Sequence, residues 1–119
     1  MKKISKKGEV IRQKLFAVYQ LMAESREHKC TGCDQYNVPI SHSHIIPRSR
    51  RGDLTTEIDN LTYHCLSMGE NIGCHDIWDN GTAEEKKMLI DYEQNMEYIE
   101  RVDKEYYNLL RLKETKFNT

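Results

Sequence analysis

Apolar residues recur at intervals of three and four positions in the first part of the chain. Between Glu9 and Glu27 the recurring residues are Val10, Ile11, Leu15, Val18, Tyr19 and Met22. This spacing puts them on one face of a helix. It therefore predicts an amphipathic helix of about five turns that packs one face on a core.

A second helical pattern begins after Asn80-Gly81. The tetrapeptide Thr82-Ala83-Glu84-Glu85 matches a capping box, in which the Thr and Glu side chains each bind a backbone N–H at a helix start. The apolar residues after it repeat with a helical period: Met88, Leu89, Tyr92, Met96, Ile99, Val102, Tyr106, Leu109 and Leu110. The sequence predicts one long helix or two helices within 82–119.

The segment between these helices has a different character. Residues 28–81 hold all four Cys, all five His, both Pro and five of the six Gly, as expected of a loop-rich segment that carries a site. Its best strand candidates are Val38–Ile46 and Leu61–Cys65, which predict an antiparallel hairpin, and a short helix is expected from Cys74 to Asp79. The expected fold class is α+β.

The 119 residues suffice for a single domain with a modest core. We expect one domain over 1–119, comprising a basic helical arm (1–29), a core (30–81) and a helical region (82–119). No apolar run approaches the roughly 20 residues that cross a bilayer, and no hydrophobic leader follows the first lysines. We therefore expect an intracellular, cytoplasmic protein without a membrane partner.

Charge is unevenly distributed along the chain. The formal net charge is −1, but residues 1–29 contain eight Lys or Arg against three Glu. In the central segment the three arginines lie together, at Arg48, Arg50 and Arg51. A phosphate-binding surface is compatible with this distribution, although a solvated basic tail and a solvated turn would look the same.

The four cysteines have the spacing of a metal site. Cys30 and Cys33 form a C-x2-C knuckle with Gly32 inside it, and Cys65 and Cys74 follow after 31 and eight further residues. A tetrahedral Zn²⁺ takes four such thiolates, and it would link the start of a small hairpin to its end. Eight residues are more than a second knuckle usually has, so reduced cysteines without metal remain an alternative.

Histidines supply candidate catalytic chemistry. In an extended strand His42 and His44 share a face, and on a helix His75 and Asp79 lie one turn apart. If zinc holds Cys74 beside the hairpin, His75 is brought close to the first pair. One imidazole free to act as a base beside several ligands for a second ion would suit metal-assisted phosphodiester hydrolysis.

In this order along the chain, the motifs resemble those of the HNH endonucleases, particularly the zinc-knuckle subgroup common in phages and restriction systems. Residues 44–49 (His-Ile-Ile-Pro-Arg-Ser) are similar to the family's first motif, Asn60-Leu61 to its second and Cys74-His75 to its third. The resemblance runs from Cys30 to about Asp79. It implies a ββα-metal core linked by a four-cysteine zinc site, with an additional N-terminal helix and a long C-terminal helix.

The resemblance also implies roles for individual residues. It makes His44 the general base, His75 a ligand of a catalytic Mg²⁺ or Mn²⁺, and Asn60 the residue that orders the hairpin loop by hydrogen bonding. Asp79 stands where some members have a second His. Ser43 stands where Asp or His is common, and it is a poor ligand, so His42 or a water would have to replace it.

The function expected from this resemblance is hydrolysis of DNA by one catalytic ion, with Arg48, Arg50 and Arg51 as candidate phosphate contacts. A second possibility is a zinc-knuckle nucleic-acid-binding module whose catalytic site has decayed, which Ser43 motivates. A third is that the acidic C-terminal helical region forms a homodimer or docks the chain onto a larger phage or restriction complex. Alternation along its strand places His64 on the face opposite Tyr63 and Cys65, and a structural or a surface role is expected for it.

Overall fold

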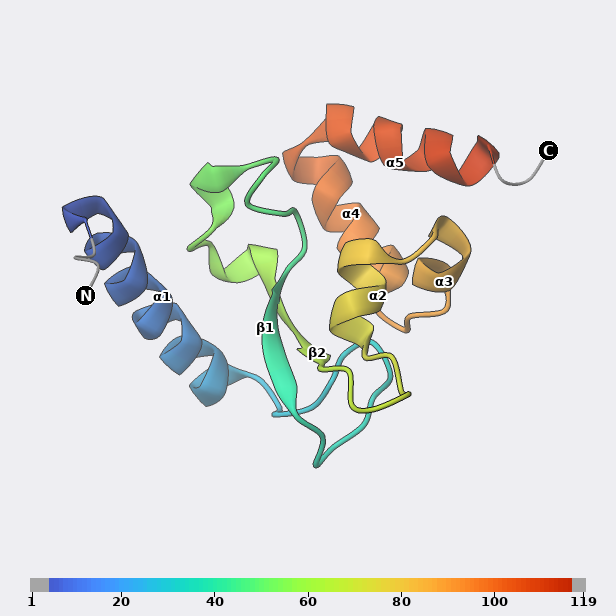
Figure 1. Cartoon of the computed structure of the whole chain (residues 1–119). Helices are drawn as coiled ribbons and strands as arrows, with labels where there is room; N and C mark the ends of the chain where they lie inside the picture. The colour runs from blue at the N-terminus through green and yellow to red at the C-terminus, as the bar shows by residue number, and fades with distance from the viewer. Residues whose placement is uncertain (1–4, 117–119) are drawn as a thin grey trace.

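Two short strands form an antiparallel hairpin at the centre of the molecule. In the computed structural model, which describes residues 5–116, β1 (Ile40–His44) pairs with β2 (Leu61–Cys65), and His42 lies opposite Tyr63. The second strand has the predicted bounds, whereas the first is shorter than predicted at both ends. Figure 1 shows the hairpin between α1 on one side and the remaining helices on the other.

Alternation along the strands gives the hairpin two different faces. Leu61 and Tyr63 of β2 point toward α1 (Lys6–Ser25) and pack on Met22. On the opposite face Ser43 and His64 are fully buried toward the other helices. The predicted N-terminal helix is confirmed. It begins earlier than expected because Ser5 caps it, accepting a hydrogen bond from the Gly8 N–H.

The polar connection between the strands contains two turns of 3-10 helix. These are η1 (Gly52–Leu54) and η2 (Ile58–Asn60). The second ends directly at β2, and it places the buried Asn60 beside the residues that follow β1. The connection thus returns to the end of β1 near His44.

Four helices follow the hairpin, and they contribute most of the main core. They are α2 (Cys74–Asn80), α3 (Ala83–Lys87), α4 (Tyr92–Val102) and α5 (Lys104–Lys116). The core between them and the hairpin includes Ile46, Trp78, Tyr92, Met96 and Ile99. Figure 1 shows α5 crossing above α4, with α2 and α3 below it.

The expectation of one or two helices after residue 82 is wrong, because three are present. The predicted capping box is confirmed at Thr82 and Glu85 and begins α3. The first break in the helical region separates α3 from α4. There the Ile90 N–H donates a hydrogen bond to the carbonyl oxygen of Gly32 in the cysteine knuckle, at 2.9 Å. The second break is at Asp103, which has non-helical backbone angles (φ −146°, ψ 80°) and whose carboxylate pairs with Arg50. Both breaks are made by tertiary contacts.

The described residues thus form a small α+β structure with a two-stranded sheet and five α-helices. Within this part of the chain, every helix is too short or too polar to cross a bilayer.

Candidate functional site

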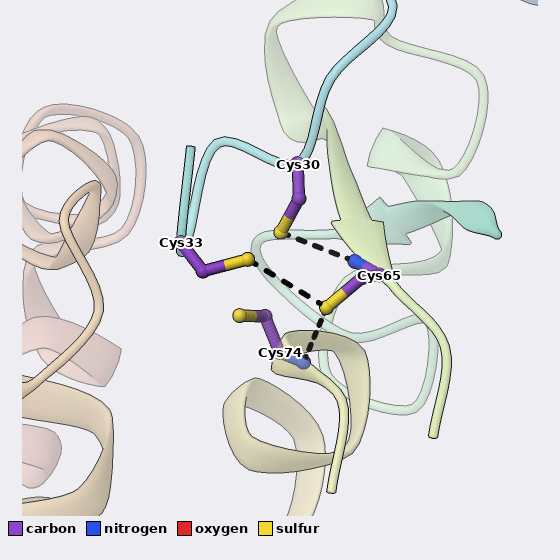
Figure 2. Close-up of side chains that lie close together, drawn as sticks. All are labelled: Cys30, Cys33, Cys65 and Cys74. Atoms are coloured by element: carbon purple, nitrogen blue, oxygen red, sulfur yellow. Dashed lines mark hydrogen bonds between the residues drawn. The ribbon is translucent and has the colours of Figure 1, made fainter. Parts of the chain in front are cut away.

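The four cysteines meet at one point beside the end of the hairpin. Figure 2 shows Cys30 and Cys33 from the knuckle, Cys65 from the end of β2 and Cys74 from the start of α2 with their sulfurs turned toward one another. All four thiols are free, and their Sγ atoms lie within 4.8 Å of one another. The Sγ atoms of Cys33 and Cys65 are 3.9 Å apart. Tetrahedral Zn–S bonds of about 2.3 Å separate sulfurs by about 3.8 Å, so the cluster fits a structural zinc.

Two glycines let the backbone close around this cluster. A Cβ atom at Gly32 would lie 2.9 Å from both Cβ and Sγ of Cys74, and a Cβ at Gly73 would lie 2.4 Å from the Cys65 carbonyl oxygen. Backbone N–H groups donate to the sulfurs, from Cys65 to Cys30 Sγ at 3.2 Å and from Cys74 to Cys65 Sγ at 3.3 Å. The long loop between Cys65 and Cys74 is therefore compatible with a closed four-thiolate site.

Burial opposes the ionisation of two of the four thiols, Cys33 and Cys74, whereas the pKa of Cys30 is lowered because hydrogen bonds to its sulfur outweigh its burial. Burial, with the neighbouring Cys30 sulfur, raises the pKa of Cys33 to about 11, and it raises the pKa of Cys74 further still. A divalent cation reverses this effect because its charge offsets the repulsion between thiolates. The chemistry of the donor set therefore matches Zn²⁺, which prefers thiolate sulfur in closed structural sites.

A buried polar network joins the knuckle to α4, and the sequence did not reveal it. His64 Nε2 lies 2.8 Å from Asp91 Oδ2, and the Thr31 hydroxyl donates to the same oxygen at 2.7 Å. His64 and Asp91 are 0% and 5% exposed, and the hydrogen bonds that Asp91 accepts from His64 and Thr31 hold its pKa low despite its burial. Of the two roles expected for His64, structural or surface, its burial agrees with the structural one. Its partner Asp91 lies 27 positions away, and no local spacing pointed to it.

A cleft of about 610 Å³ opens at the other end of α2. It is bounded by the end of β1 and the segment after it, by α2 and α3, and by α5. It brings together four residues that the sequence singled out: His44, Arg48, His75 and Asp79. The sequence-based expectation that zinc at Cys74 would carry His75 to the hairpin agrees with this arrangement.

His44 is held in one orientation at the edge of the cleft. Its Nε2–H donates to the carbonyl oxygen of buried Thr55 at 3.0 Å, so the Nδ1 atom keeps its lone pair. Burial lowers the pKa of His44, with a smaller contribution from the Arg48 charge, and outweighs the opposing effect of the Thr55 carbonyl. The imidazole therefore stays neutral down to a lower pH than an ordinary histidine does, and in this state it can accept a proton.

His75 and Asp79 face each other one helical turn apart. His75 Nε2 lies 3.2 Å from Asp79 Oδ2. On the other side of the ring, Nδ1 lies 2.8 Å from the hydroxyl of Ser41, which donates its own proton to the His64 carbonyl oxygen. Nδ1 then carries a ring proton, and Nε2 is the ring atom turned toward the carboxylate. A neutral imidazole and a carboxylate arranged in this way can share a cation between them.

Ser41 was not singled out from the sequence, although a signal for it existed. The alternation that pairs His42 with His44 also places Ser41 and Ser43 together on the opposite face of β1. That face is the one turned toward α2. The side chain that holds His75 therefore comes from the serine face and not from the histidine face.

His42 lies away from the cleft, contrary to the expectation that it shares a site with His44. Its ring stacks on Tyr19 of α1, with centroids 3.7 Å apart and planes 14° apart, and burial lowers its pKa. His44 is the last residue of β1, where the chain leaves the sheet, so alternation no longer holds the two side chains to one face. Ser43 is fully buried, and its Oγ has no partner among the described residues.

Asn60 ties the two ends of the connection together. Its Oδ1 accepts the Ile46 N–H at 2.8 Å, and its Nδ2 donates to the carbonyl oxygens of Ile46 at 3.0 Å and Leu54 at 3.2 Å. These bonds are of the kind that the resemblance implied. They fix the backbone directly after His44.

Two of the three arginines form ion pairs within the protein, and the third lies at the cleft. Arg50 pairs with Asp103 at 3.2 Å, and Arg51 pairs with Asp53 at 2.8 Å, so both anchor the connection to its surroundings. Arg48 is exposed at the cleft, and among residues 5–116 it has no carboxylate partner. Of the three predicted phosphate contacts, Arg48 has the geometry for one.

No family model, curated protein or solved structure matches the chain. The resemblance to HNH endonucleases therefore rests on the sequence motifs alone. Within the described residues, the cysteines are the one group of three or more Cys, His, Asp or Glu side chains close enough to hold an ion. His44, His75 and Asp79 share a cleft without forming a tight three-ligand set.

Proposed function

We propose that this protein is a metal-dependent endonuclease of the HNH type that hydrolyses DNA phosphodiester bonds. The observation that carries the proposal is the cleft in which an oriented neutral imidazole, a His–carboxylate pair and an arginine come together. These are a base, a cation site and a phosphate contact, the three groups that hydrolysis of a phosphodiester requires.

The four cysteines have a structural task in this proposal. A Zn²⁺ bound by all four thiolates has no open coordination position, so it serves the fold and not the reaction. It would hold the start of α2 against the end of β2, and so keep His75 beside Ser41.

His44 is the general base in this mechanism. Its Nδ1 lone pair takes a proton from a water molecule, and the water oxygen forms a bond to phosphorus as the bond from phosphorus to the 3′-oxygen breaks. The Thr55 carbonyl stabilises the imidazolium that forms, because it accepts a hydrogen bond from Nε2. A solvent proton completes the 3′-hydroxyl, and the other product end is a 5′-phosphate, as in the family resembled.

His75 and Asp79 would hold a divalent cation such as Mg²⁺ or Mn²⁺, with Ser41 fixing the imidazole tautomer. When bound, such an ion would stabilise negative charge on the phosphoryl and leaving oxygens. Arg48 contributes a fixed positive charge to the same phosphate. Asn60 acts through the backbone after His44 and is a positioning residue.

Cleavage of supercoiled plasmid and of circular single-stranded DNA tests the proposal. We expect the zinc-loaded protein to cut in Mg²⁺ or Mn²⁺, and His44→Ala to lower the rate by about 10²- to 10⁴-fold, the usual contribution of a general base. His28→Ala, which removes an exposed imidazole outside the cleft, is the matched control and should cut at the wild-type rate. Failure of the wild type to cut either substrate in every ion would refute the nuclease.

One observation favours a second function, a zinc-knuckle module that binds nucleic acid without cutting it. The strand position that often supplies a ligand is the buried Ser43, and His42 is stacked on α1. The cation pair would then be a remnant. This alternative predicts DNA binding with no cleavage, and equal behaviour of the wild type and His44→Ala.

A further inference from the structure

The cleft extends beyond the candidate cation pair. Past Asp79 it is lined by Lys86 of α3 and by Tyr106, Leu110 and Lys113 of α5. The candidate catalytic groups occupy only one end of it. The far end has no role in the chemistry proposed above.

Two lysines face this far end without counter-ions. The Lys86 side chain is half-buried, with its Nζ 5.6 Å from the Trp78 ring centroid. Burial and the nearby Lys113 charge lower its pKa. Within residues 5–116 neither lysine forms an ion pair with a carboxylate. Of the acids that line the cleft, Glu114 is already bound by Arg111 and the Tyr92 hydroxyl, and Asp79 faces His75. Two ammonium groups gathered in this way favour an anion.

The floor of the cleft is apolar, unlike its rim. Side chains of the main core form it: Ile45, Trp78, Tyr92, Met96 and Leu110. A cationic rim above an apolar floor suits an unstacked nucleotide, whose base is apolar on its face and whose phosphate is charged.

Size favours one strand over two. About 610 Å³ is within the range of small-ligand pockets, and it is enough for a nucleotide or two. Duplex DNA is much larger, since its major groove alone is about 12 Å wide. Its paired bases are also stacked inside the helix, so they cannot lie on the floor of the cleft. A duplex would have to open before it entered.

We propose that the cleft receives a single, unpaired DNA strand, with a base on the apolar floor and the phosphate beside the scissile one held between Lys86 and Lys113. That the phosphate next to the one held by the lysines is the scissile one rests on the proposed nuclease function. The preference for an unpaired strand does not. Arg48 at one end and the two lysines at the other then follow successive phosphates.

Binding without cleavage tests this assignment. Zinc-loaded protein, in buffer free of Mg²⁺ and Mn²⁺, is titrated against a labelled 15-nucleotide strand and against the same strand annealed to its complement, at several salt concentrations. We expect the single strand to bind at least about tenfold more tightly. Lys86→Met and Lys113→Met should each lower the slope of log affinity against log salt by up to about 0.7, the value for loss of one single-strand phosphate contact.

Lys87→Met is the matched control, because Lys87 is exposed on the same helix outside the cleft, and its salt slope should stay at the wild-type value. The assignment is overturned if the duplex binds as tightly as the strand, or if both cleft variants behave like the control. Should Lys86→Met not fold, the exposed Lys113→Met carries the same test. A preference for the single strand without cleavage in any metal would support this assignment and refute the nuclease. Cleavage without a preference for the single strand would support the nuclease and refute this assignment.

Discussion

The cysteine cluster and the cleft lie at opposite ends of one short helix, yet they are built differently. Cys74 begins α2 and Asp79 lies one residue before its end. The cluster gathers four like donors within 4.8 Å, whereas the cleft offers two facing donors and a base set further off. Closed four-thiolate sites are structural, and sites with few protein ligands leave positions open for water and substrate.

That difference suggests how the two sites depend on each other. The hairpin is too small to be stable by itself, so the cluster has to hold α2 in place. The cleft then depends on α2 to carry His75 and Asp79 to β1. Loss of the cluster should destroy both sites, whereas loss of a cleft residue should leave the cluster intact.

The largest expected effect follows from breaking the cluster. Cys30→Ser should abolish tight zinc binding and lower the free energy of unfolding by more than about 4 kcal/mol, because a structural metal site contributes folding energy directly. Elemental analysis and thermal unfolding measure the two effects. Met68→Ala, a change at an exposed residue in the loop between Cys65 and Cys74, is the control and should keep about one equivalent of zinc. Zinc retained in Cys30→Ser with an unchanged melting curve would contradict the structural assignment.

A smaller effect concerns the protonation of His44. The base works when neutral, so the cleavage rate should rise about tenfold per pH unit below its pKa and level off above it. Because burial lowers this pKa from the usual value near 6.5, the half-maximal rate should fall below about pH 6.5. A pH–rate profile at saturating metal measures it. A midpoint clearly above that value would conflict with the buried, neutral imidazole.

The smallest effects separate two neighbouring arginines. Arg48→Met should weaken binding to the 15-nucleotide strand and lower its salt slope by about 0.7, while leaving stability unchanged. Arg50→Met should do the opposite, lowering the free energy of unfolding slightly by loss of the partly exposed Asp103 pair while leaving the salt slope unchanged. Salt titrations and thermal melts distinguish them. Equal loss of binding in both variants would show that Arg50 contacts DNA despite its ion pair with Asp103.

Local chemistry explains why part of this molecule was predictable. The capping box at Thr82 and the bounds of β2 depend on residues close together in sequence, and both appear in the structure. The four cysteines are further apart in sequence, but their residue type alone indicated that they would gather. Asn60 was also identified, since its hydrogen bonds were implied by a motif.

The features that were not predictable depend on distant contacts. The breaks at Ile90 and Asp103 follow from a backbone bond to Gly32 and from pairing with Arg50, which no helical period encodes. His42 turns to α1 because Tyr19 stacks on it. The lysines at the far end of the cleft lie on separate helices, and only folding brings them together.

The central claim is that one ion holds the fold and a second, exchangeable ion serves the reaction. Its most direct test is the DNA cleavage rate of protein carrying one equivalent of zinc, measured as Mn²⁺ is added, for the wild type and Asp79→Ala. We expect zinc content to stay constant, cleavage to require Mn²⁺ and saturate, and Asp79→Ala to need at least about tenfold more Mn²⁺ for its half-maximal rate. Equal cleavage with zinc alone, or the same Mn²⁺ requirement in both proteins, would contradict the claim.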